Sequence, residues 1–81
     1  MTQYKYTVIF EPAEEGGYIV HVPALNGIAT QGETLEEAKK MGIDLIKGYL
    51  ETLIELGLPI PDDDFEAEPN ELNLEKLVVA L

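Results

Sequence analysis

The sequence lacks cysteine, arginine, serine and tryptophan, and it contains a single histidine. Without cysteine the chain can form neither disulfides nor thiolate metal sites. Without serine or cysteine it also lacks two common catalytic nucleophiles. No run approaches the roughly 18 apolar residues of a membrane helix, and the first residues do not have the pattern of a signal peptide. We therefore expect a cytoplasmic protein that needs no cofactor and does not enter a membrane.

Positive charge is also scarce. The chain has five lysines and 16 acidic residues, which give a net charge of −11. The imbalance is greater in the second half, where ten acids and two lysines follow six acids and three lysines. Phosphate and base recognition depend on arginine and on clustered positive charge. The composition therefore argues against direct nucleic-acid binding and favours a basic protein partner.

The 81 residues allow one domain, which begins with a pattern typical of strands. Alternating aromatic and β-branched residues predict strands over residues 4–10 and 18–22, joined by an acidic, glycine-containing connection. Pro23 should end the second strand, since proline has no N–H for a ladder. Asn26 and Gly27 form a turn dipeptide before a short third strand over residues 28–31.

A helix start is marked by Thr34 as N-cap with Glu37 three residues later, which is the pattern of a capping box. Gly57 suits the position after the helix, and Pro59 prevents its continuation. These signals predict a helix of about 22 residues that begins near Leu35.

Apolar residues recur along this helix at steps of three and four, which predicts one face packed on the sheet. We interpret Gly42 as a site of close approach between helix and sheet. The apolar residues 77–81 predict a fourth strand, or else a packed tail. The predicted core stripe comprises Ala38, Met41, Leu45, Tyr49, Leu53 and Leu56, flanked by Ile46 and Leu50.

Three blocks of sequence resemble the HicB antitoxin family: GGYIVHVPALNG at residues 16–27, TQGETLEEA at residues 30–38 and LGLPIP at residues 56–61. The resemblance implies an α+β fold of antiparallel β-β-β-α-β order, a reduced ribonuclease H-like arrangement in two layers, with one long helix on a small sheet. The positions that carry the motif are Gly17, Pro23, Gly27, Gly32, Thr34, Glu37, Gly57 and Pro59.

The same resemblance implies a non-enzymatic antitoxin that binds a small, basic HicA-type messenger-RNA interferase and covers its RNA-binding surface and catalytic histidine. The sequence departs from the family pattern at Ile28, where members often have cysteine. It also stops at Leu81, where full-length antitoxins commonly continue into a DNA-binding domain. We therefore expect one domain over residues 1–81 that does not bind DNA itself. The alternative is an orphan, oligomeric binding module without a toxin.

Two groups of residues are candidates for partner binding. Ile19 and His21 should lie on the sheet face opposite the helix, and a lone histidine on a strand is not expected to be catalytic. The second group lies in an acidic loop over about residues 62–70, which we expect to be solvated and to offer Asp62, Asp63, Asp64 and Glu66 to a basic partner. A metal-dependent hydrolase ranks last, because the first two strands carry no carboxylate in their interiors. A small sheet with open edges also predicts a homo-oligomer, either a dimer or a tetramer.

Overall fold

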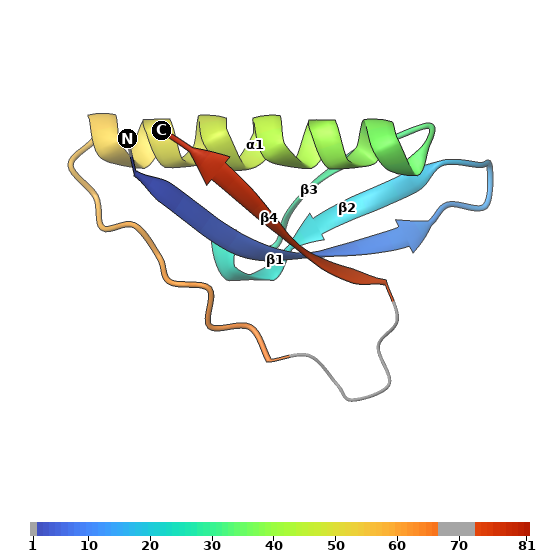
Figure 1. Cartoon of the computed structure of the whole chain (residues 1–81), viewed down its shortest axis with the longest axis horizontal. Helices are drawn as coiled ribbons and strands as arrows, with labels where there is room; N and C mark the ends of the chain where they lie inside the picture. Colours follow the sequence, from blue (N-terminus) through green and yellow to red (C-terminus); the bar gives the residue numbers. More distant parts are fainter. Residues whose placement is uncertain (1, 67–72) are drawn as a thin grey trace.

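The computed structural model describes residues 2–66 and 73–81, which form one sheet with a long helix on one side (Figure 1). The sheet comprises β1 (Gln3–Pro12), β2 (Tyr18–Val22), β3 (Ile28–Gly32) and β4 (Leu74–Ala80). The helix α1 (Leu35–Glu55) connects β3 with the segment that leads to β4. The predicted α+β fold of β-β-β-α-β order is therefore confirmed.

All neighbouring strands are antiparallel, in the order β3-β2-β1-β4. β1 is the longest strand, and it pairs with β4 along residues 3–9 and with β2 along residues 9–12. The fourth strand begins at Leu74, three residues before the apolar run that predicted it, because Leu74, Glu75 and Lys76 continue the ladder opposite Ile9, Val8 and Thr7.

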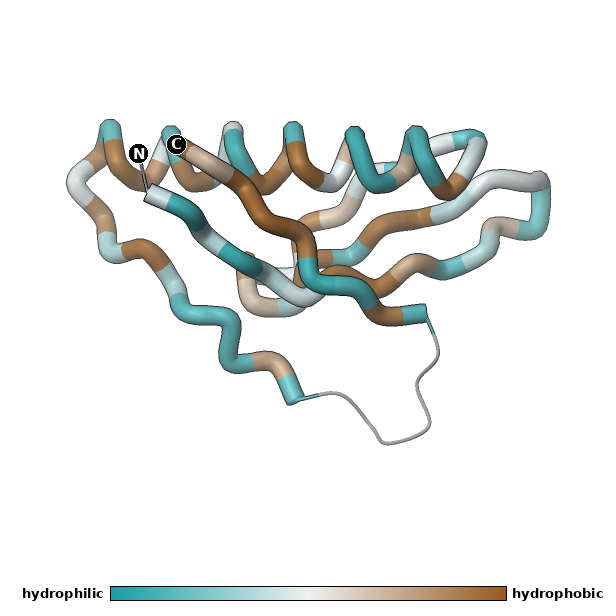
Figure 2. Tube along the Cα trace, viewed as in Figure 1, coloured by the Kyte–Doolittle hydropathy of each residue, from teal (hydrophilic) through white to brown (hydrophobic). Residues whose placement is uncertain are grey.

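The core lies between α1 and the inner face of the sheet, and hydrophobic residues gather there (Figure 2). Alternation along the strands places every second residue on this face. The buried residues are Tyr6, Val8 and Phe10 of β1, Val20 and Val22 of β2, Leu77 and Val79 of β4, Leu25 of the turn after β2, and Ala38, Ile46 and Leu50 of α1.

The start and the end of α1 follow the signals in the sequence. The Thr34 hydroxyl oxygen accepts a hydrogen bond from the Glu37 backbone N–H at 3.0 Å. The Glu37 carboxylate accepts from the backbone N–H of Glu33 at 2.9 Å, one residue before the partner that a capping box would give it. Gly57 follows the helix with a φ of 70°, which glycine adopts without strain.

The helix is rotated relative to the predicted core stripe. Its buried residues are Ala38, Gly42, Ile46 and Leu50, whereas Met41 is 40% and Leu56 is 65% exposed. The predicted stripe was therefore wrong in its centre. The helix packs on the sheet through a row of residues spaced by four, which includes the small residues Ala38 and Gly42. Gly42 confirms the predicted close approach: a Cβ at this position would lie 3.1 Å from a methyl carbon of Leu77 and 3.2 Å from one of Val20.

The connection from β2 to β3 contains a feature that the sequence analysis missed. Pro23 ends β2 as predicted, and residues Pro23–Leu25 then form a turn of 3-10 helix, η1. Leu25 is fully buried by this turn. Asn26 and Gly27 follow with φ values of 62° and 64°, so that the predicted turn dipeptide returns the chain into β3.

Part of the outer sheet face is covered by residues 61–66, which we call the acidic segment. The first residue of the segment is held by Tyr6 of the inner face, whose Oη donates a hydrogen bond to the Pro61 carbonyl oxygen. On the outer face, Thr7 Oγ1 donates to Asp63 Oδ2 at 2.7 Å. Lys76 Nζ lies 3.5 Å from the same Asp63 oxygen. Thr7 is buried as a result, although it points away from the helix. Figure 1 shows the segment on the side of the sheet opposite α1.

Replacing Tyr6 with phenylalanine should lower the free energy of unfolding by about 1 kcal/mol at pH 7, because the bond to Pro61 is lost. Burial, with the nearby charge of Asp62, raises the pKa of Tyr6 above its usual value of 10. The unfolded chain therefore ionises first as the pH increases. The stability that Tyr6 contributes is complete below pH 10 and is lost as the pH rises through the higher pKa of the folded state. Denaturation between pH 7 and 11 should show a shallower decline above pH 10 for Tyr6→Phe; an equal decline would contradict this prediction.

Candidate partner-binding surfaces

Ile19 and His21 lie on the outer sheet face, as the alternation of β2 predicted. Ile19 is opposite Glu11 of β1, and His21 is opposite Ile9. Both side chains are half-buried, and His21 Nε2 lies 3.2 Å from Glu11 Oε1. The two residues therefore share one open part of the sheet, next to the part that the acidic segment covers.

The predicted acidic loop is not uniformly solvated. Asp62, Asp64 and Glu66 are exposed, but the Asp63 side chain is only 10% exposed and is held by Thr7 and Lys76. The prediction was wrong for Asp63, because the sequence does not reveal that this carboxylate reaches the hydroxyl of Thr7. Residues 67–70 of the predicted loop lie outside the described residues. Asp62, Asp64 and Glu66 therefore provide the exposed negative charge of this segment.

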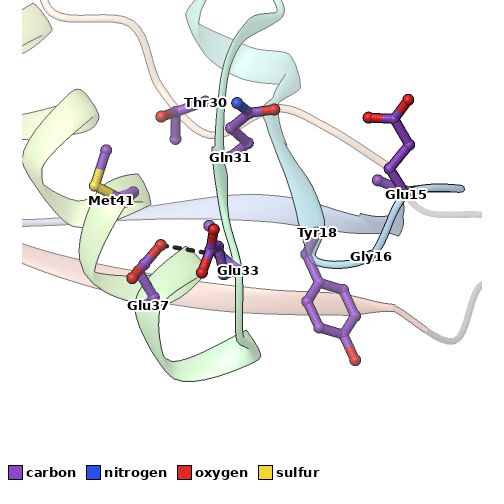
Figure 3. Close-up of a pocket in the computed structure, with 10 residues that line it drawn as sticks. Glu15, Gly16, Tyr18, Thr30, Gln31, Glu33, Glu37 and Met41 are labelled. Carbon is purple, nitrogen blue, oxygen red and sulfur yellow. Dashed lines mark hydrogen bonds between the residues drawn. The ribbon is translucent and has the colours of Figure 1, made fainter.

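A second surface lies where β3 meets the start of α1, beside the β1–β2 connection. It is a hollow of about 840 Å³, lined in part by Glu15, Tyr18, Glu33, Glu37 and Met41 (Figure 3). Three carboxylates and an aromatic ring share this hollow. Carboxylates pair with lysine and arginine, and aromatic faces attract the same cations. The hollow therefore has the chemistry to receive basic side chains.

A third surface follows the same margin of the sheet toward the end of α1. This helix–β3 groove, of about 370 Å³, lies between Ile28 of β3 and a flank of the helix formed by Asp44, Leu45, Gly48, Tyr49, Thr52 and Leu53. The apolar spacing predicted Leu45, Tyr49 and Leu53 as core residues; all three are half-buried, and Tyr49 and Leu53 pack against the buried core. The apolar sector of the helix is wider than the part of the helix that the sheet covers. This width was the only sign in the sequence that these residues would be half-buried.

Neither a metal site nor a membrane helix is found in the parts of the chain that the structure describes. Across residues 2–66 and 73–81, no three acidic, histidine or cysteine residues come together as metal ligands. No helix within these ranges combines the length and the hydrophobicity that crossing a membrane requires. What these residues offer is charged and apolar surface.

These features define a small two-layer α+β protein with several recessed surfaces and a net charge of −11. In comparison with known families, residues 6–81 match the family described as HicB_like antitoxin of bacterial toxin-antitoxin system. The chain belongs to this family.

Relatives in other organisms support the assignment. The chain is 39% identical over 66 residues to UPF0150 protein ssr1765 of Synechocystis, covering 82% of this chain and 84% of that protein. It is 42% identical over 57 residues to Antitoxin HicB 1 of Photorhabdus laumondii, where the match covers 70% of this chain but only 37% of the antitoxin. The crystal structure of the Burkholderia pseudomallei antitoxin HicB matches with a TM-score of 0.69 and 27% identity, across all of this chain and 64% of that one. The matched region is therefore a part of these longer antitoxins.

Proposed function

We propose that this chain is an antitoxin that binds and neutralises a small, basic HicA-type messenger-RNA interferase by covering its surface. Membership of the antitoxin family provides the general role. The observation that carries the identity of the partner is the net charge of −11 on a chain without arginine. Such a chain attracts a basic protein and repels the RNA that the toxin would otherwise bind.

The folded structure pairs part of the chain's positive charge internally, and each pair leaves the net charge of −11 unchanged. Lys39 lies 3.0 Å from Glu75, and Lys76 lies 3.5 Å from Asp63, so two of the five lysines are already paired within the protein. Exposed carboxylates extend from the hollow at Glu33 and Glu37 to Asp62 and Asp64 on the opposite side of the sheet. Complementary charge accelerates encounter, while tight binding needs buried apolar contacts as well.

The test is a ribonuclease assay with a purified HicA-type toxin and this chain at increasing molar ratios. Cleavage of a model messenger RNA should stop near equimolar antitoxin. Raising the salt from about 0.05 to 0.5 M should slow association at least tenfold, because the Debye length shortens. Unchanged cleavage at a large excess of antitoxin would overturn the proposal.

The matched control is Gly32→Ala, which keeps the net charge and which we expect to disrupt the fold. Inhibition that depends on a folded surface should be lost in this variant when it is unfolded. If the unfolded variant inhibits as strongly as the wild type, non-specific charge is responsible, and binding by a HicB-like surface is rejected.

A second candidate, an orphan module that acts as a dimer or tetramer, is favoured by the position of β4. It is an outer strand of the sheet, seven residues long, and Val78 on its outer face is 47% exposed. Edge strands of this length can pair with the same strand of a second copy of the chain. Light scattering at micromolar concentration should give the mass of a dimer or tetramer if this candidate is correct, and the mass of one chain would reject it.

A further inference from the structure

The flank of α1 that faces the β3 margin has more apolar surface than the fold uses. The buried row of Ala38, Gly42, Ile46 and Leu50 already covers the sheet. Successive residues turn by 100° around a helix, so Met41, Leu45 and Tyr49 form a second row beside the first. β3 is an edge strand of the sheet, and the second row of helix residues extends past this edge.

Gly48 is the residue that keeps the helix–β3 groove open. It lies on the exposed flank of the helix, and a Cβ built there would meet nothing within 4 Å. Glycine in the middle of a helix is destabilising relative to alanine, and here no internal contact requires it. The Thr52 hydroxyl, four residues further along the helix, donates to the Gly48 carbonyl at 2.9 Å, so this hydroxyl needs no partner from the groove. Close access to the helix backbone is what the missing side chain provides.

We propose that the helix–β3 groove is the docking site for apolar side chains of the basic toxin. This inference rests on the proposed function and names the surface that performs it. Ile28, Leu45, Tyr49 and Leu53 provide the apolar contacts. Asp44 lies in the same groove, and Glu37 lies one hollow further along the same margin.

Charge decides between a basic partner and a second copy of this chain. Two copies would each carry −11, and the carboxylates that border this margin would face like charge across the interface. A basic protein instead finds an apolar floor with negative charge beside it. Interfaces commonly combine these features, with an apolar centre and a polar rim that orients the partner.

The decisive experiment compares Gly48→Arg with Gly48→Ala in calorimetric binding to a HicA-type toxin whose catalytic histidine has been replaced by alanine. Both substitutions favour the helix, so each should raise Tm, by about 4 to 8 °C for alanine. Only arginine fills the groove and adds a positive charge to it. We expect Gly48→Arg to weaken binding at least tenfold and Gly48→Ala, which adds only a methyl group to the groove, to weaken it by a factor at least three times smaller.

A second matched pair separates the groove from the overall field of the protein. Asp44→Lys and Glu51→Lys each change the net charge by the same amount on exposed positions of α1, but only Asp44 lines the groove. The inference requires Asp44→Lys to weaken binding by at least fivefold more than Glu51→Lys does. Equal losses of affinity would show that the overall electrostatic field of the protein alone accounts for the weaker binding. They would overturn the proposal that the toxin docks in the groove.

The outcomes distinguish this inference from the function on which it rests. If the wild type binds the toxin and Gly48→Arg binds equally well, the groove is rejected and the antitoxin function stands. If the folded wild type does not bind the toxin, the proposed function fails, and the assignment of the groove to a toxin fails with it. If the free wild type is a dimer that Gly48→Arg converts to a monomer, the groove joins two copies, and a toxin site there is rejected.

Discussion

Replacing Gly32 with alanine should destabilise the fold by about 3 kcal/mol, which is a large part of the stability of a domain this small. Gly32 is the last residue of β3, where the strand meets the first turn of α1. An added Cβ would lie 2.4 Å from the backbone nitrogen of Ala38 and 2.7 Å from its Cα. Both are backbone atoms, so no side-chain rotation relieves the overlap, and β3 must separate from the helix. Urea denaturation followed by circular dichroism measures the loss.

Gly48→Ala is the matched control, because it adds the same methyl group where nothing lies within 4 Å. It should stabilise the protein by about 1 kcal/mol through helix propensity alone. The two substitutions are therefore expected to change stability in opposite directions. If Gly32→Ala is neutral, the strand and helix can move apart without loss, and the close contact between them does not stabilise the fold.

The features that the sequence predicts correctly are those set by local chemistry. Thr34 and Gly57 mark the ends of α1 because capping and a positive φ depend on a few neighbouring residues. Pro23 ends β2 because it lacks a donor for the ladder. Alternation along residues 4–10 fixes which side chains face the helix, as the burial of Tyr6, Val8 and Phe10 shows. Element order and the faces of the strands therefore follow from pattern alone.

The candidate site depends on contacts between distant parts of the chain, and these cannot be obtained from a local pattern. In the sequence, Asp63 does not differ from the other members of its acidic run. It nevertheless accepts a hydrogen bond from the hydroxyl of Thr7, which lies 56 positions away. The groove at Gly48 arises because β3 is short and lies at the margin of the sheet, which leaves the flank of α1 without cover. Neither feature has a signature in the sequence around it.

The rotation of α1 has a similar cause. A helix that is apolar over a wide sector can rest on a sheet in several orientations, and hydrophobic spacing does not choose among them. Gly42 and Ala38 decide the orientation here, because their small size brings the helix axis close to Val20 and Leu77. The row that contains them becomes the buried centre, and Met41 moves to the flank.

This orientation predicts very different losses for two alanine substitutions only five residues apart. Ile46→Ala should lower the free energy of unfolding by about 3 kcal/mol, because Ile46 is fully buried and its removal leaves a cavity beneath the helix. Met41→Ala should change it by less than about 1 kcal/mol, because Met41 is 40% exposed and alanine has the higher helix propensity.

Urea denaturation of both variants, with the slope m checked for constancy, measures the two losses on the same scale. Met41 belongs to the stripe that hydrophobic spacing alone selects, while Ile46 only flanks it, so the comparison distinguishes the two orientations directly. Equal losses, or a larger loss for Met41→Ala, would mean that the helix turns its Met41–Leu45–Tyr49 row into the core in solution. In that orientation the helix–β3 groove would close, and its apolar side chains would no longer be available to a partner.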